Sequence, residues 1–241
     1  MLIEFTVNKQ SLWLQNIANQ FGVEVINNTI FFPEHIGKGY LRHYYFSNGL
    51  TLNYLNFLFY EEVTFSRKEG PSNLFSPIMF YIHGRSMQQD IDKRQMIISS
   101  ESPNGIFWPS SQISTKWKFP VKEWMSNITI AINHEWLLNN CQGEETHKLR
   151  EQLTSGKAFY IFEDITAEMQ QLIREIVEII EEGHHKCISR LFLESKTTEL
   201  LATFIEKVIK RPLQENKTCL NSKDVEKLFE IKKILTDNLS S

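Results

Sequence analysis

The chain has 241 residues, of which 41% are hydrophobic and 23% charged, which is typical of a soluble globular protein with a sizeable core. Its 26 basic and 29 acidic residues give a formal net charge of -3. The chain therefore lacks the surplus of Lys and Arg with which proteins grip nucleic-acid phosphates. Three widely spaced cysteines indicate reduced thiols. Since no signal peptide or bilayer-spanning apolar stretch is visible, we expect a cytoplasmic protein.

The first half of the chain, residues 1–133, has the pattern of β structure. A two-residue turn signal, Asn27-Asn28, separates the short segments 23–26 and 29–32. A second turn, Ser47-Asn48-Gly49, joins Tyr40–Phe46 to Leu50–Phe59, and its glycine can adopt a left-handed conformation. We therefore expect two hairpins in this region.

Alternating apolar side chains predict further strands in the same half. Ile78, Phe80 and Ile82 alternate with their neighbours, and the clearest alternation is found in 113–119 and 127–133. Short strands separated by turns are typical of a sandwich or a barrel. The high aromatic content is compatible both with a solid core and with an enclosed ligand site.

After Asn133 the pattern becomes helical. Residues 134–138 and 144–153 predict two short helices, while 158–162 is a brief apolar run that could form a strand or an ordered link. Thr166 is placed to cap a longer helix that ends near Gly183. One face of that helix carries Met169, Leu172, Ile173, Ile176 and Ile180.

The segment Lys186–Lys210 predicts a second long helix. Its first apolar stripe consists of Leu193, Thr197, Leu200, Phe204 and Val208, and a neighbouring face is also largely apolar. Such a wide apolar arc suits either a helix buried deep in one core or a helix that also meets a partner. The short link before it makes the two long helices antiparallel neighbours. Residues 212–221 predict a linker, and Ser222 caps a final amphipathic helix.

The sequence shows none of the short motifs that signal catalysis. His134-Glu135 begins a zinc-protease motif, but Leu138 stands where the second His is required. No glycine-rich phosphate loop and no Gly-x-Ser-x-Gly turn is present. His184, His185 and Cys187 could bind a metal, although adjacent histidines cannot easily face one ion. We therefore expect no enzyme activity, no catalytic residues, no metal and no cofactor.

Several segments together resemble the N-terminal regulatory domain of AraC/XylS-type bacterial transcription regulators. They are the strand–turn–strand Gly39–Leu50, the strand Ile78–Gly84, the strand-to-helix exit Ile130–Leu137, the helix Leu191–Leu201 and the last helix Asp224–Asn238. The likeness covers nearly the whole chain and is greatest to the subgroup that includes siderophore-responsive activators. The family's helix-turn-helix domain is absent, because the chain stops where that domain would begin.

The resemblance implies an α+β fold. A cupin-like antiparallel β-barrel (1–133) is followed by an antiparallel helical pair (134–211) and a linker with a C-terminal helix (212–241). It implies a domain that senses a small effector, forms a homodimer and reaches DNA only through the absent domain. Dimer geometry would then set the spacing of the DNA-reading helices.

We expect the effector to bind in the barrel, in contact with Tyr54, Phe80, Trp108, Trp117, His43 and His83. We expect the dimer to form through the helix residues Leu201, Ile205 and Val208. The alternatives are that the aromatics simply fill a solid core and that the helix residues pack within their own domain. At the level of function, the alternatives are a cupin-type isomerase or oxygenase and a ligand-free interaction module.

Overall fold

The computed structural model describes residues 1–6, 12–70, 75–84, 87–91, 94–98, 104–182 and 188–210. Residues Met1–Ile209 form one compact unit. The expected linker and helix at 212–241 lie outside the described residues, as do His184, His185 and Cys187. None of the helices in the described part is long and apolar enough to cross a membrane.

The strands form two separate sheets, and the α+β class is confirmed. Sheet A has the order β1-β5-β10-β7-β8, and its strands are β1 (Leu2–Phe5), β5 (Thr64–Arg67), β10 (Thr115–Lys118), β7 (Met87–Ile91) and β8 (Arg94–Ile98). Sheet B has the order β12-β9-β6-β11-β4-β3-β2, and its strands are β12 (Tyr160–Glu163), β9 (Ile106–Pro109), β6 (Phe75–His83), β11 (Trp124–Asn133), β4 (Thr51–Phe59), β3 (Gly37–Tyr45) and β2 (Thr29–Phe31). Neighbouring strands pair antiparallel except β1 and β5, which are parallel.

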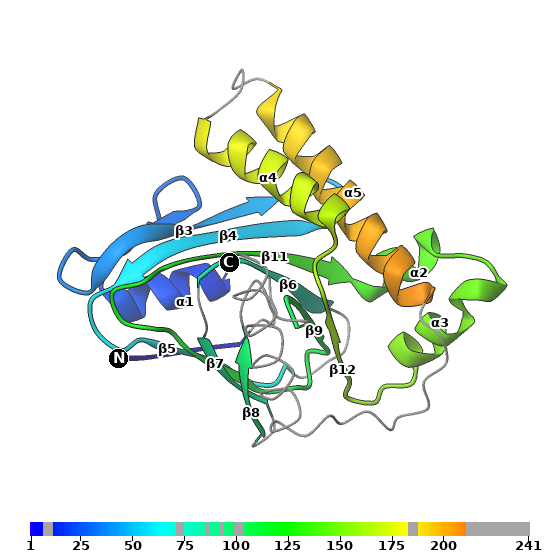
Figure 1. The fold of residues 1–241 in the computed structure, drawn as a ribbon, viewed down its shortest axis with the longest axis horizontal. Helices are drawn as coiled ribbons and strands as arrows, with labels where there is room; N and C mark the ends of the chain where they lie inside the picture. The colour runs from blue at the N-terminus through cyan, green and yellow to red at the C-terminus, as the bar shows by residue number, and fades with distance from the viewer. Residues whose placement is uncertain are drawn as a thin grey trace, which may run out of the picture. The chain divides into compact units, whose positions relative to one another are not determined.

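The helices are α1 (Leu12–Phe21), α2 (His134–Asn140), α3 (His147–Thr154), α4 (Ala167–Glu182) and α5 (Ser189–Ile209), with a short 3-10 turn at Glu144–Thr146. Figure 1 shows α4 and α5 side by side next to sheet B. The hydroxyl of Thr166 accepts from the Met169 amide, as expected of a cap. The predicted apolar stripe of α4 is buried as well.

Two parts of the sequence prediction for residues 1–133 are wrong. Residues 12–21 form α1, because Trp13, Ile17 and Phe21 recur four residues apart and are buried against the strands. Gly22, with φ +69°, ends this helix. Residues 23–26 form no strand, since Ile26 makes only a single bridge to Thr29 across the Asn27-Asn28 turn.

Sheet B is buried on both faces. One face meets sheet A and α1 in the inter-sheet core, which includes Leu55, Phe57, Met79, Phe107 and Phe119. The other face meets α2–α5 in the helix-side core, which includes Leu52, Ile78, Ile128, Ile130 and Phe204. Because side chains alternate along a strand, each central strand of sheet B contributes to both cores. The segment 158–162, left open by the sequence, joins this sheet as β12.

A buried hydrogen-bond chain links sheet B to α2. Trp108 Nε1 donates to Ser76 Oγ at 2.7 Å, and Ser76 Oγ lies 2.7 Å from Nε2 of His134, the first residue of α2. His134 is 4% exposed, and burial lowers the pKa of its imidazole from 6.5 to about 4. The folded protein therefore holds this histidine in the neutral form at neutral pH.

This burial predicts a pH dependence of stability. Between pH 6.5 and 4 the unfolded chain binds a proton at His134 that the folded chain does not, so stability falls as the pH falls through this window. The unfolding free energy of His134→Gln, measured by urea denaturation between pH 7 and 4, should fall less steeply with falling pH than that of the wild type. His147→Gln, which makes the same change at an exposed helical position, is the control. An unchanged slope for His134→Gln would contradict this assignment.

The helix residues expected at the dimer interface are largely buried within the chain. Leu201 and Ile205 are 2% and 4% exposed in the helix-side core, and Val208 is partly buried against it. Leu191 and Phe192, in the first turn of α5, are exposed instead. Leu201 and Ile205 therefore pack within the chain, because the face of α5 that carries them lies on sheet B.

Two leucines of α5 provide a matched test of this placement. Leu201→Ala should cost about 2–5 kcal/mol of unfolding free energy, since it opens a cavity in a packed core. Leu191→Ala, at a residue that is 67% exposed, should stay within about 0.5 kcal/mol of wild type. Urea denaturation of both variants measures the difference. Equal costs for the two changes would contradict the packing described here.

Candidate functional site

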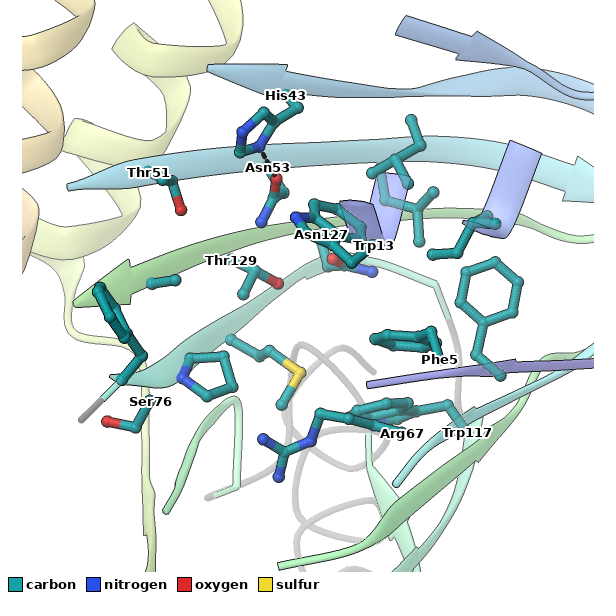
Figure 2. A pocket seen from close by; sticks show the side chains of 18 of the residues that line it. Phe5, Trp13, His43, Thr51, Asn53, Arg67, Ser76, Trp117, Asn127 and Thr129 are labelled. Atoms are coloured by element: carbon teal, nitrogen blue, oxygen red, sulfur yellow. Dashed lines mark hydrogen bonds between the residues drawn. The ribbon is translucent and has the colours of Figure 1, made fainter. Parts of the chain in front are cut away.

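A cavity of about 140 Å³ lies in the inter-sheet core. Both sheets and α1 contribute to its wall, as the side chains in Figure 2 show. Most of the wall is apolar, and it includes Phe5, Trp13, Phe65, Met79, Met87 and Trp117. A cavity lined mainly by apolar groups with a few polar ones is the usual form of a small-molecule site.

A row of neutral polar side chains crosses the inner face of sheet B. His43, Asn53 and Thr129 are register partners on β3, β4 and β11. Asn127 and Thr51 line the cavity beside this row. Figure 2 shows these side chains along one side of the cavity. Their hydroxyl, amide and imidazole groups provide both donors and acceptors to a ligand.

His43 is held in one orientation within this row. Its Nδ1 lies 2.6 Å from Asn53 Oδ1, and its ring meets the edge of Trp13 at 5.6 Å between centroids. Burial lowers the pKa of His43, and the hydrogen bond to Asn53 offsets part of that shift. As a carbonyl oxygen only accepts, Nδ1 carries the proton and Nε2 is the acceptor of a neutral imidazole.

A second hydrogen-bond chain ties the two sheets together beside the cavity. Trp117 Nε1 on β10 donates to Tyr81 Oη on β6 at 3.2 Å, and Tyr81 Oη donates to Gln89 Oε1 on β7 at 2.9 Å. Burial raises the pKa of Tyr81, so its phenol stays protonated and remains a donor. Trp117 and Tyr81 both line the cavity, and this chain fixes their rings.

Arg67 is the buried cation of the cavity wall. It is 3% exposed and lies on β5 of sheet A, across from the polar row. Its Nε donates to Thr115 Oγ1 at 3.2 Å, and its Nη2 donates to the carbonyls of Ser110 and Ile113 at 3.3 and 2.6 Å. All three acceptors are neutral. Burial lowers the pKa of Arg67 to about 10, so the guanidinium is charged at neutral pH.

Of the six residues expected to contact an effector, two line the cavity and four do not. Trp117 and His43 line the cavity. Tyr54, Phe80 and Trp108 lie on the opposite face of sheet B, in the helix-side core. The rings of Phe80 and Trp108 both contact Phe204 of α5, at 5.9 and 5.6 Å between centroids. His83, at the end of β6, is exposed and does not line the cavity.

The sequence analysis named only His43 of the polar row, and it missed Arg67. It found the alternation of apolar residues in 127–133 but assigned no place to the residues between the isoleucines. Yet neither β4 nor β11 carries a charged side chain on either face. That composition is typical of a strand buried on both sides, and it could have placed Asn53, Asn127 and Thr129 inside the molecule.

Within the described residues, His, Cys, Asp and Glu side chains form no group of three or more that could hold a metal ion. Cys141 is a partly buried free thiol, and burial raises its pKa. The other two cysteines lie outside the described residues.

The family description "Regulatory protein PchR N-terminal domain" matches residues 36–218. This match extends from β3 through the long helices, and it confirms the resemblance to a regulatory N-terminal domain of the AraC type. The segment with β1 and α1, which supplies Phe5, Trp13 and Ile17 to the cavity wall, precedes the matched residues. No curated protein sequence matches the chain significantly.

Three solved structures are reported for their likeness in fold. The AraC-like transcriptional activator CuxR is 10% identical with a TM-score of 0.42, covering 87% of this chain and 70% of its own. The Cnp3 cupin domain of Schizosaccharomyces pombe is 10% identical with a TM-score of 0.31, covering 44% and 73%. A variant of the Bacillus subtilis oxalate decarboxylase OxdC is 15% identical with a TM-score of 0.28, covering 58% and 43%.

Proposed function

Because the chain belongs to the family of PchR N-terminal regulatory domains, we propose that it senses a small effector for an AraC-type transcription regulator. The effector binds in the cavity between the two sheets. The observation that carries this proposal is the cavity itself, which combines an apolar wall with a row of hydrogen-bonding groups inside a regulatory domain. We propose no catalytic function, since the matched family is a regulatory one.

The construction of sheet B supports a route from the cavity to the helices. On β11, Asn127 and Thr129 face the cavity, while Ile128 and Ile130 face the helix-side core. A ligand that repositions β11 therefore also displaces the surface on which α4 and α5 rest. Such a ligand shifts the equilibrium only to the extent that it binds one arrangement of the sheet more tightly than the other.

We also propose how the domain passes its signal on. Its framework is a cupin-like β-barrel that carries an antiparallel helical pair. The helices form a homodimer, and a helix-turn-helix domain beyond residue 241 contacts DNA. Since Leu201 and Ile205 are buried within the chain, the dimer contact uses exposed side chains of α5 such as Phe192. Ligand binding then changes the dimer geometry.

Filling the cavity tests the proposed effector site. A library of single-ring compounds is screened for thermal stabilisation of the protein, and the hits are titrated by calorimetry. Ala131 lines the cavity from β11, so Ala131→Phe should weaken the hits at least tenfold by occupying their space. Ala202→Phe makes the same change on the exposed side of α5 and should leave their affinities unchanged.

Circular dichroism first establishes that both variants are folded. A library without hits, or hits that bind Ala131→Phe as tightly as wild type, would contradict an effector site between the sheets.

A further inference from the structure

The charged side chains that the described residues place around the cavity are all positive. Among the described residues that line it, Arg67 and Lys68 carry full charges and none is Asp or Glu. Lys68 pairs with Glu4 at 2.6 Å, with both side chains about half exposed, so its charge is largely satisfied at the surface. Arg67 is thus the cation inside the cavity wall.

Arg67 is held by neutral partners. Its hydrogen bonds go to a threonine hydroxyl and two backbone carbonyls, and within the described residues no carboxylate forms an ion pair with it. Burial lowers its pKa, and no acid among the described residues offsets the shift. A buried charge without a counter-charge is costly in a protein interior, and an anion that binds beside it relieves that cost.

The guanidinium also has N–H groups that these three hydrogen bonds do not use. Arginine has five N–H groups, and the three hydrogen bonds of Arg67 use Nε and Nη2. Nη1 donates to none of the described residues. Those same bonds fix the guanidinium plane, because they tie it to Thr115 and to the carbonyls of Ser110 and Ile113. An oriented guanidinium with a free nitrogen is suited to binding a carboxylate.

The remaining wall sets the size and character of the rest of the ligand. A cavity of about 150 Å³ admits benzene, and the cavity here is of the same size at about 140 Å³. Trp13, Met79 and Trp117 offer aromatic and sulfur contacts to a ring. The polar row on sheet B lies across from Arg67 and can accept or donate to a ring substituent.

We propose that the cavity selects a single-ring carboxylate, with Nη1 of Arg67 binding the carboxylate and the apolar wall binding the ring. This inference rests on the proposed function, and it adds the chemical class of the effector. It also gives Arg67 a role beyond cross-linking β5 to the segment 110–113.

Benzoate and benzamide test the charge directly, since they differ little in shape and only benzoate is an anion at neutral pH. Calorimetric titration of the wild-type protein should show benzoate binding at least tenfold more tightly than benzamide. Arg67→Lys, which keeps the charge, should retain most of this preference, and Arg67→Gln should abolish it. Lys118→Gln removes a half-exposed charge that does not line the cavity and should leave the preference unchanged.

The comparison of the two compounds on wild-type protein decides the inference even where Arg67→Gln fails to fold. Equal binding of benzoate and benzamide would overturn the anion inference and leave the effector site intact. A preference that persists in Arg67→Gln, or is lost in Lys118→Gln, would overturn the role of Arg67. Absence of binding by both compounds would overturn the inference too, while the library screen with Ala131→Phe decides the proposed function separately.

Discussion

The double burial of sheet B is the constraint on which the rest of the structure depends. Each of its central strands must present one set of side chains to sheet A and the alternate set to the helices. On β11, Asn127 and Thr129 face the cavity, whereas Ile128 and Ile130 face the helix-side core. The apolar set faces α4 and α5, where tight packing holds the helices in place. The mixed set faces the cavity, where hydrogen-bonding groups serve a ligand.

The two faces of the cavity differ in chemistry for a physical reason. Sheet B supplies neutral polar groups to the cavity, and two of them, His43 and Asn53, are paired with each other at 2.6 Å. Sheet A supplies the charge, because Arg67 reaches backbone carbonyls of the neighbouring segment 110–113. The resulting arrangement gives a ligand one cationic end and one neutral polar side.

Much of the fold could be predicted from the sequence, while the location of the site could not. Turn residues with positive φ, such as Asn27 and Gly49, and the caps and stripes of the helices are local features. Which face of a strand is interior depends on what covers it, and alternation alone does not reveal this. Tyr54, Phe80 and Trp108 therefore suggested a ligand site although they pack in the helix-side core. Arg67 was missed because an isolated basic residue in a strand gives no sign of burial.

The positions of the tryptophans allow the central claim, that the ligand site lies between the sheets and not under the helices, to be measured directly. Trp13 and Trp117 line the cavity, and Trp108 lies in the helix-side core. Fluorine NMR of protein labelled with 5-fluorotryptophan, titrated with benzoate, should shift the resonances of Trp13 and Trp117 first and furthest. A shift confined to Trp108, with Trp13 and Trp117 unchanged, would contradict a site between the sheets.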